Sequence, residues 1–131
     1  MRILIIEGRE ADAKLLRSVL ESGRHEVSRA GCAEEAMQMI SDGFIPQAIV
    51  TDLDLPGIDG LTLARCLCKC TWTSGVPVIA LTAYPDRFPH GSDERAYFAA
   101  YVVKPIDPRT LAGLVVSICQ SQALLALAER T

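Results

Sequence analysis

An apolar run that leads directly into an acidic loop occupies residues 48–60, which read AIVTDLDLPGIDG. The run reaches Asp52 without alternating polar positions, which is typical of a strand buried on both faces of a parallel sheet. Pro56 and Gly57 then turn the chain into a loop. A second apolar run, close to the start of the chain, ends in the same way at Glu7. Two buried strands that each end in an acid predict a parallel sheet with carboxylates at one edge.

Helical and strand patterns alternate along the rest of the chain. The alternation implies right-handed crossovers and an α/β fold, with a doubly wound five-stranded parallel sheet of flavodoxin-like strand order 2-1-3-4-5. Pro85, Pro89 and Gly91 interrupt the segment between the last two strands, so we expect the fourth helix to be short or irregular and to lie near residues 92–98. The expected strands are 2–6, 25–29, 48–52, 76–81 and 101–103, and the expected regular helices are 11–21, 33–40, 61–70 and 107 to about 129.

Length and charge limit the classes of function. The 131 residues fit one domain, and the net charge of −3 gives no electrostatic reason to expect nucleic acid or anionic membrane as a partner. We find no signal-peptide pattern and no apolar run long enough to span a membrane, which predicts a cytoplasmic protein. Five cysteines without a secretory signal argue against a disulfide framework. Cys66 and Cys70 share one helical face and Cys68 points elsewhere, and the sequence does not say what this run does.

Polar side chains follow four of the expected strands. Glu7 and Asp52 end the two strands that flank the reversal of strand order, while Thr82 and Lys104 follow the last two strands. Ligands bind such sheets outside the carboxyl ends of the strands, at this reversal. Two facing carboxylates favour a Mg²⁺ ion, and a carboxylate can attack phosphorus to give an aspartyl phosphate. The ammonium and hydroxyl groups could then compensate the phosphoryl charge.

These residues resemble a family, the receiver domain of bacterial two-component response regulators. The matching segments are Ile3 to Glu7, Ala48 to Gly60, Pro77 to Ala83 and Tyr101 to Pro105, in the order of the family. The resemblance implies that a histidine kinase or phosphotransfer protein phosphorylates the chain, which is then a signalling switch and not a conventional enzyme. It also implies an output partner, or a homodimer contact, on the face of the fourth helix, fifth strand and last helix.

The resemblance also implies individual roles. Asp52 matches the phosphoryl acceptor, with Thr82 and Lys104 as the groups that contact the phosphoryl oxygens. Glu7, Asp52 and the backbone carbonyl of Asp54 match the ligands of Mg²⁺. Thr82 and Tyr101 match a pair that moves on activation. The receiver domain would span residues 1–122, and residues 123–131 would extend the last helix as a connector.

One position departs from the family. The second acid that usually ends the first strand, a direct metal ligand, is replaced by Gly8. The loss of one carboxylate should weaken Mg²⁺ binding and therefore phosphoryl transfer. Two readings follow from this departure. The chain is a phosphoryl-accepting receiver, or it is an atypical receiver that works as a phosphorylation-independent protein-interaction module.

Overall fold

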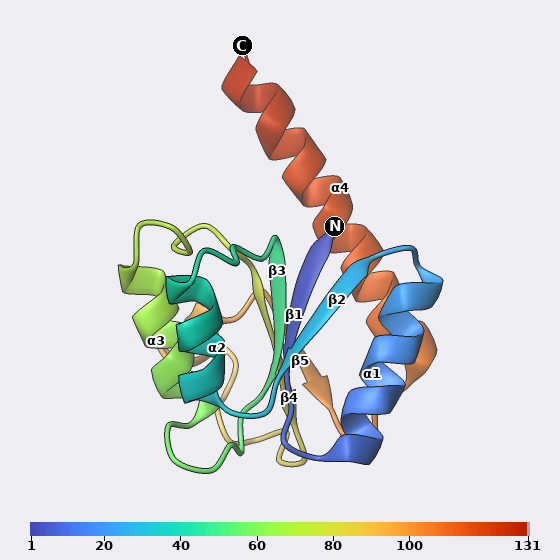
Figure 1. The fold of residues 1–131 in the computed structure, drawn as a ribbon, viewed down its shortest axis with the longest axis vertical. Helices are drawn as coiled ribbons and strands as arrows, with labels where there is room; N and C mark the ends of the chain where they lie inside the picture. Colours follow the sequence, from blue (N-terminus) through green and yellow to red (C-terminus); the bar gives the residue numbers. More distant parts are fainter. Residues whose placement is uncertain (131) are drawn as a thin grey trace.

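The computed structural model describes residues 1–130 and contains one five-stranded parallel sheet with helices on both faces (Figure 1). The strand order is β2-β1-β3-β4-β5, so the predicted fold class is confirmed. The strands are β1 (Arg2–Ile6), β2 (Glu26–Ala30), β3 (Ala48–Asp52), β4 (Val78–Thr82) and β5 (Ala100–Val103). The helices are α1 (Glu10–Ser22), α2 (Ala33–Ser41), α3 (Gly60–Lys69) and α4 (Pro108–Arg130), with a 3₁₀ turn, η1, at Arg95–Tyr97.

The two faces of the sheet carry separate hydrophobic layers. Because side chains alternate along a strand, Ile3 and Ile5 of β1 pack with α1 and α4, whereas Leu4 and Ile6 pack with α2 and α3. Figure 1 shows these two helix pairs on opposite sides of the sheet. These four side chains are fully buried, which explains why β1 is apolar from its second residue to its end.

Between β4 and β5 the chain forms no α-helix among the described residues. The segment is a long loop that ends in η1, and Gly91 adopts a left-handed backbone with φ +81°. Prolines at 85 and 89 remove backbone donors that a helix would use. The predicted irregularity of the fourth helix is confirmed, and its regular part is a single 3₁₀ turn.

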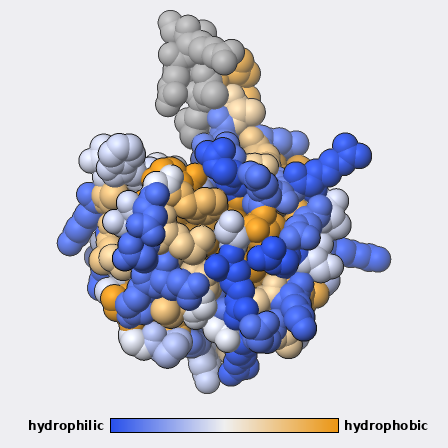
Figure 2. Space-filling view, viewed as in Figure 1, coloured by the Kyte–Doolittle hydropathy of each residue, from blue (hydrophilic) through white to orange (hydrophobic). Residues whose placement is uncertain are grey.

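The last helix starts where the sequence predicted. The Asp107 carboxylate accepts a hydrogen bond of 2.9 Å from the Arg109 backbone N–H, which satisfies one donor at the start of α4. The helix then runs past the body of the domain, at the end opposite the carboxyl ends of the strands (Figure 1). Leu124 and Leu127 on this protruding part are 66% and 58% exposed, and the hydrophobic surface is visible in Figure 2. Residue 131 of the predicted extension lies outside the described residues.

No helix within residues 1–130 has the length and hydropathy to cross a membrane.

Candidate functional site

The strand register brings the predicted site residues to one edge of the sheet. Ile6 of β1 pairs with Thr51 of β3. The residues that follow this pair, Glu7 and Asp52, therefore come to the same edge of the sheet. Thr82 at the end of β4 pairs with Val103 at the end of β5, and Lys104 is the next residue of the chain. A hollow of about 590 Å³ opens at this edge. Its lining residues, which we call the acid pocket, are Glu7, Gly8, Arg9, Asp52, Asp54, Pro56, Ala83, Tyr84 and Lys104.

A single ammonium group connects the carboxylates of the acid pocket. Lys104 Nζ lies 2.8 Å from Asp52 Oδ2 and 3.2 Å from Glu7 Oε2. It also lies 3.4 Å from Asp12 Oδ2, a carboxylate from the first turn of α1. Glu7 is only 1% exposed and Asp52 6%, so both charges depend on nearby partners rather than on water.

Burial and charge act against each other on these groups. Burial raises the pKa of Glu7 above its ordinary value, the Asp52 charge adds to the rise, and a hydrogen bond from the Arg9 backbone N–H and the Lys104 ammonium only partly offset it. For Lys104, burial alone would lower the pKa, but the hydrogen bond to Asp52 and the charge of Glu7 outweigh burial and raise it. The site therefore holds a charged lysine among carboxylates that repel one another.

The loop after β3 is built tightly against the end of that strand. A Cβ on Gly60 would lie 2.6 Å from the Asp52 carbonyl oxygen and 2.8 Å from Leu53 Cα, so only glycine fits at the start of α3. Gly57 has φ +74°, which glycine adopts at low energetic cost. Asp59 caps α3 by accepting a 2.8 Å hydrogen bond from the Thr62 backbone N–H. These contacts explain the residue types of the 48–60 stretch and fix the backbone that carries Asp52.

Asp54 contacts both the Asp52 carboxylate and the loop after β4. Its backbone N–H donates a 2.8 Å hydrogen bond to Asp52 Oδ1. Its side chain accepts a hydrogen bond from Arg87 Nη1, in the loop after β4, and the two groups form an ion pair. No periodicity or motif indicated a role for Arg87 in advance.

Thr82 and Tyr101 lie on the neighbouring strands β4 and β5, and within residues 1–130 neither side chain forms a hydrogen bond with a carboxylate of the acid pocket. Thr82 is fully buried, and its hydroxyl accepts a 2.9 Å hydrogen bond from the Tyr84 backbone N–H. The Tyr101 hydroxyl is buried and has no hydrogen-bond partner within the described part of the chain. Its ring contacts Phe98 edge-to-face, with centroids 6.3 Å apart, and Arg95 stacks over it at 4.0 Å. The structure thus brings Glu7, Asp52, Asp54 and Lys104 together in the lining of one pocket, whereas Thr82 and Tyr101 do not line it.

The carboxylates of the acid pocket suit a hard divalent cation. Glu7 and Asp52 each direct an oxygen to the same ammonium, so their oxygens border one small region, and Mg²⁺ prefers oxygen ligands. Their negative charges exceed the positive charge of Lys104. Gly8 lines the same region and supplies no side-chain oxygen. The residues present therefore fit Mg²⁺, with one side-chain ligand fewer than an acid at position 8 would give.

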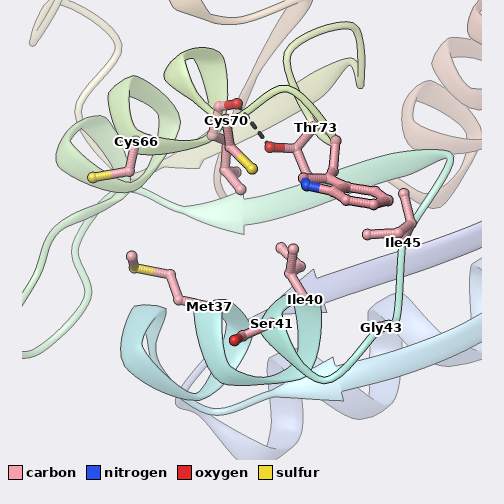
Figure 3. Close-up of a pocket in the computed structure, with 10 residues that line it drawn as sticks. Met37, Ile40, Ser41, Gly43, Ile45, Cys66, Cys70 and Thr73 are labelled. Atoms are coloured by element: carbon pink, nitrogen blue, oxygen red, sulfur yellow. Dashed lines mark hydrogen bonds between the residues drawn. The ribbon is translucent and has the colours of Figure 1, made fainter.

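A second hollow, of about 490 Å³, lies between α2 and α3 (Figure 3). Its lining is mainly apolar and includes Met37, Ile40 and Trp72 together with the thiols of Cys66 and Cys70. Cys68 lines a neighbouring hollow instead, which agrees with the predicted division of the cysteine run between helix faces. This second hollow shares no lining residue with the acid pocket.

Comparison with known proteins gives the same picture over most of the chain. Residues 3–116 match the family model described as the response regulator receiver domain. The polar-differentiation response regulator DivK of Brucella ovis is 31% identical over 107 residues, which cover 79% of this chain and 84% of DivK. The response regulator PleD of Caulobacter vibrioides is 30% identical over 124 residues, but the chain spans only 27% of the length of PleD.

A solved structure supports the fold and the family. The response regulator TrrA of Thermotoga maritima, in complex with Mg(2+)-BeF, superposes with a TM-score of 0.78 and 26% identity. The superposition covers 89% of this chain and 97% of the TrrA chain.

Proposed function

Because the chain belongs to the response regulator receiver domain family of two-component signal transduction, we propose that Asp52 accepts a phosphoryl group and that phosphorylation switches a protein-binding face. The observation that carries this proposal is the buried Asp52 carboxylate at the end of β3, with the Lys104 ammonium 2.8 Å from one of its oxygens. The histidine kinase or phosphotransfer protein that supplies the group, and the cytoplasm where they would meet, are part of the proposal.

The transfer requires little beyond positioning and charge compensation. An Asp52 oxygen attacks phosphorus, and the new P–O bond forms as the P–N bond of a donor phosphohistidine breaks. The bonding electron pair leaves with the imidazole nitrogen. No general base is needed because a carboxylate oxygen loses no proton when it attacks phosphorus, and the Lys104 ammonium is placed to bond a phosphoryl oxygen. Self-catalysed phosphorylation by a small phosphodonor follows the same path, with a carboxylate as the leaving group.

Family resemblance and the donor set both support Mg²⁺ in the acid pocket. Glu7, Asp52 and the backbone carbonyl of Asp54 would hold it. When bound, Mg²⁺ supplies positive charge to the oxygens of the transferring group. Gly8 removes one carboxylate from this set, so we propose that the affinity for Mg²⁺ is lower than in receivers with an acid at that position.

The output step uses the residues behind the pocket. The Thr82 hydroxyl would leave Tyr84 and turn to the phosphoryl group, and the Tyr101 ring would follow it. This movement would change the surface formed by η1, β5 and α4, where we place the partner or homodimer contact. Residues 1–122 would act as the receiver, and residues 123–131 would extend α4 as a connector.

A phosphorylation-independent interaction module is the second candidate. The observation that favours it is Gly8, together with Lys104 already bonded to the carboxylates that would receive metal and phosphate. Such a module would hold one conformation regardless of phosphodonor.

Intact-mass measurement after incubation with acetyl phosphate separates these two candidates. We expect a Mg²⁺-dependent gain of one phosphoryl mass that disappears in Asp52→Ala. Asp42→Ala is the matched control, because it removes an exposed carboxylate at the end of α2 that does not line the acid pocket. No mass gain at any Mg²⁺ concentration would reject the phosphoryl-accepting reading and favour the interaction module.

A further inference from the structure

A guanidinium group that pairs with a lining residue of the acid pocket has no role in the proposed transfer. Arg87 pairs with the Asp54 carboxylate, and the Asp54 backbone N–H bonds Asp52 Oδ1 at 2.8 Å. Arg87 is therefore linked to the phosphoryl acceptor through Asp54, which follows Asp52 by two positions in the chain. It lies over the Phe88 ring at 5.5 Å, and its charge helps to lower the pKa of Asp59, which is lowered first by the hydrogen bond from Thr62.

The Arg87–Asp54 pair also joins two loops. Asp54 belongs to the loop between β3 and α3, and Arg87 belongs to the long loop between β4 and η1. The second loop stands where a fourth helix was expected. In it Phe88, the residue after Arg87, stacks on Phe98 with ring centroids 6.5 Å apart. Phe98 in turn contacts Tyr101. A displacement of Arg87 would therefore act on a segment that reaches the ring of Tyr101.

We propose that Arg87 leaves Asp54 and bonds the phosphoryl group when Asp52 carries one, so that it reports phosphorylation to the loop between β4 and β5. This inference rests on the proposed phosphorylation of Asp52. A phosphoryl group brings nearly two negative charges and three acceptor oxygens. A guanidinium matches those oxygens with two parallel N–H donors, and the group stays charged at every physiological pH. The Asp54 carboxylate carries one negative charge and is 41% exposed to water. It therefore attracts the Arg87 guanidinium less strongly than a phosphoryl group would.

The lack of a carboxylate at Gly8 makes compensation of the phosphoryl charge by Arg87 more important. A pocket with one carboxylate fewer attracts less Mg²⁺, and the phosphoryl oxygens then need another cation. Lys104 is held by three carboxylates, whereas Arg87 is held by one. Arg87 is therefore the cation that can move to the new charge with the smaller loss of existing contacts.

Beryllofluoride binding in the presence of Mg²⁺ tests this proposal without catalysis. Bound and free fluoride are followed by ¹⁹F nuclear magnetic resonance during a titration of each variant. The decisive comparison is Asp54→Ala against the double variant Asp54→Ala/Arg87→Ala. Without the Asp54 carboxylate, removal of Arg87 can no longer leave an unpaired acid beside the pocket. Any remaining effect of Arg87 on affinity is then its own contact with the bound group.

We expect the double variant to bind beryllofluoride about tenfold more weakly than Asp54→Ala, as for loss of a charge-assisted hydrogen bond. Arg17→Ala, which removes the same charge from a surface pair on α1, should change affinity less than about twofold. Equal affinities in the two Asp54→Ala backgrounds would overturn the role of Arg87 while leaving the proposed function intact. Absence of both beryllofluoride binding and acetyl phosphate labelling in the unaltered protein would instead reject the proposed function, and with it this inference.

Discussion

The replacement of Lys104 by methionine is the sharpest test of how the acid pocket is held together. Methionine keeps much of the length of the side chain and removes the ammonium that contacts Asp52, Glu7 and Asp12. Removing one partner of a buried ion pair costs roughly 3–5 kcal/mol. The Asp12 carboxylate is 31% exposed and contributes little, so we expect a loss of about 3 kcal/mol at pH 7. With a urea m-value of about 1.5 kcal/mol per M, the unfolding midpoint falls by about 2 M.

The pH dependence of this loss identifies its origin. Burial holds the pKa of Glu7 above its ordinary value, so the folded protein takes up that proton at a higher pH than the unfolded chain does. The contribution of protonated Glu7 to stability is present below its unfolded pKa and is lost as pH rises through its folded pKa. Without Lys104 the pKa of Glu7 rises further, and the variant should regain much of its lost stability by pH 4.

Mg²⁺ gives a second readout of the same variant. The cation should stabilise Lys104→Met more than the unaltered protein, because the carboxylates have lost their competing ammonium. Lys14→Met, at an exposed lysine of α1, controls for the change of charge and should alter stability by less than about 0.5 kcal/mol. A Lys104→Met midpoint equal to that of Lys14→Met at pH 7, with and without Mg²⁺, would refute the electrostatic account of the pocket.

Three further substitutions test separate parts of the structure. Gly8→Asp should raise the affinity for Mg²⁺, measured by calorimetry, about tenfold. Gly8→Ala is its control, because both variants place a Cβ 3.3 Å from the Gly31 carbonyl oxygen and only Gly8→Asp adds a carboxylate. Equal affinities of the two variants would show that the missing acid does not limit Mg²⁺ binding. Asp59→Ala should destabilise the fold by about 1 kcal/mol at pH 7 by loss of the α3 cap. Because the hydrogen bond from Thr62 lowers the pKa of Asp59, the contribution of this cap is lost as pH falls through that lowered pKa, and a pH-independent loss would contradict it. Leu63→Ala, at a fully buried position of α3, should cost about 2–5 kcal/mol in urea unfolding, and a loss below about 1 kcal/mol would mean that this layer is loosely packed.

The accuracy of the predicted bounds differed from strand to strand. Residues 2–6 and 48–52 were predicted with the bounds that β1 and β3 have, because in each strand a run of buried apolar side chains leads to an acid, Glu7 or Asp52. Strand β2 begins one residue later than predicted and β4 two residues later. Exposed positions in β2, and Pro77 at the entry to β4, dilute the same pattern.

The site was predictable where backbone topology determines it. Glu7, Asp52 and Lys104 meet because parallel strands end at a common edge, which the order of strands along the sequence already implies. Asp12 and Arg87 were not found, since their contacts with Lys104 and Asp54 depend on side chains that reach across from a helix and a loop. A helical acid in a first turn has an ordinary role beside the helix dipole, so nothing in the sequence distinguished Asp12.

The position of Lys104 on the last strand has a consequence for the order in which the protein is made. Glu7 and Lys104 are 97 residues apart in the chain, yet their side chains form an ion pair. A ribosome adds roughly 5–20 residues per second, so the strands that carry Glu7 and Asp52 leave it several seconds before the lysine does. During that interval β1 and β3 can pair only by bringing two carboxylates together without their ammonium. The three side chains can therefore come together only after synthesis has passed Lys104.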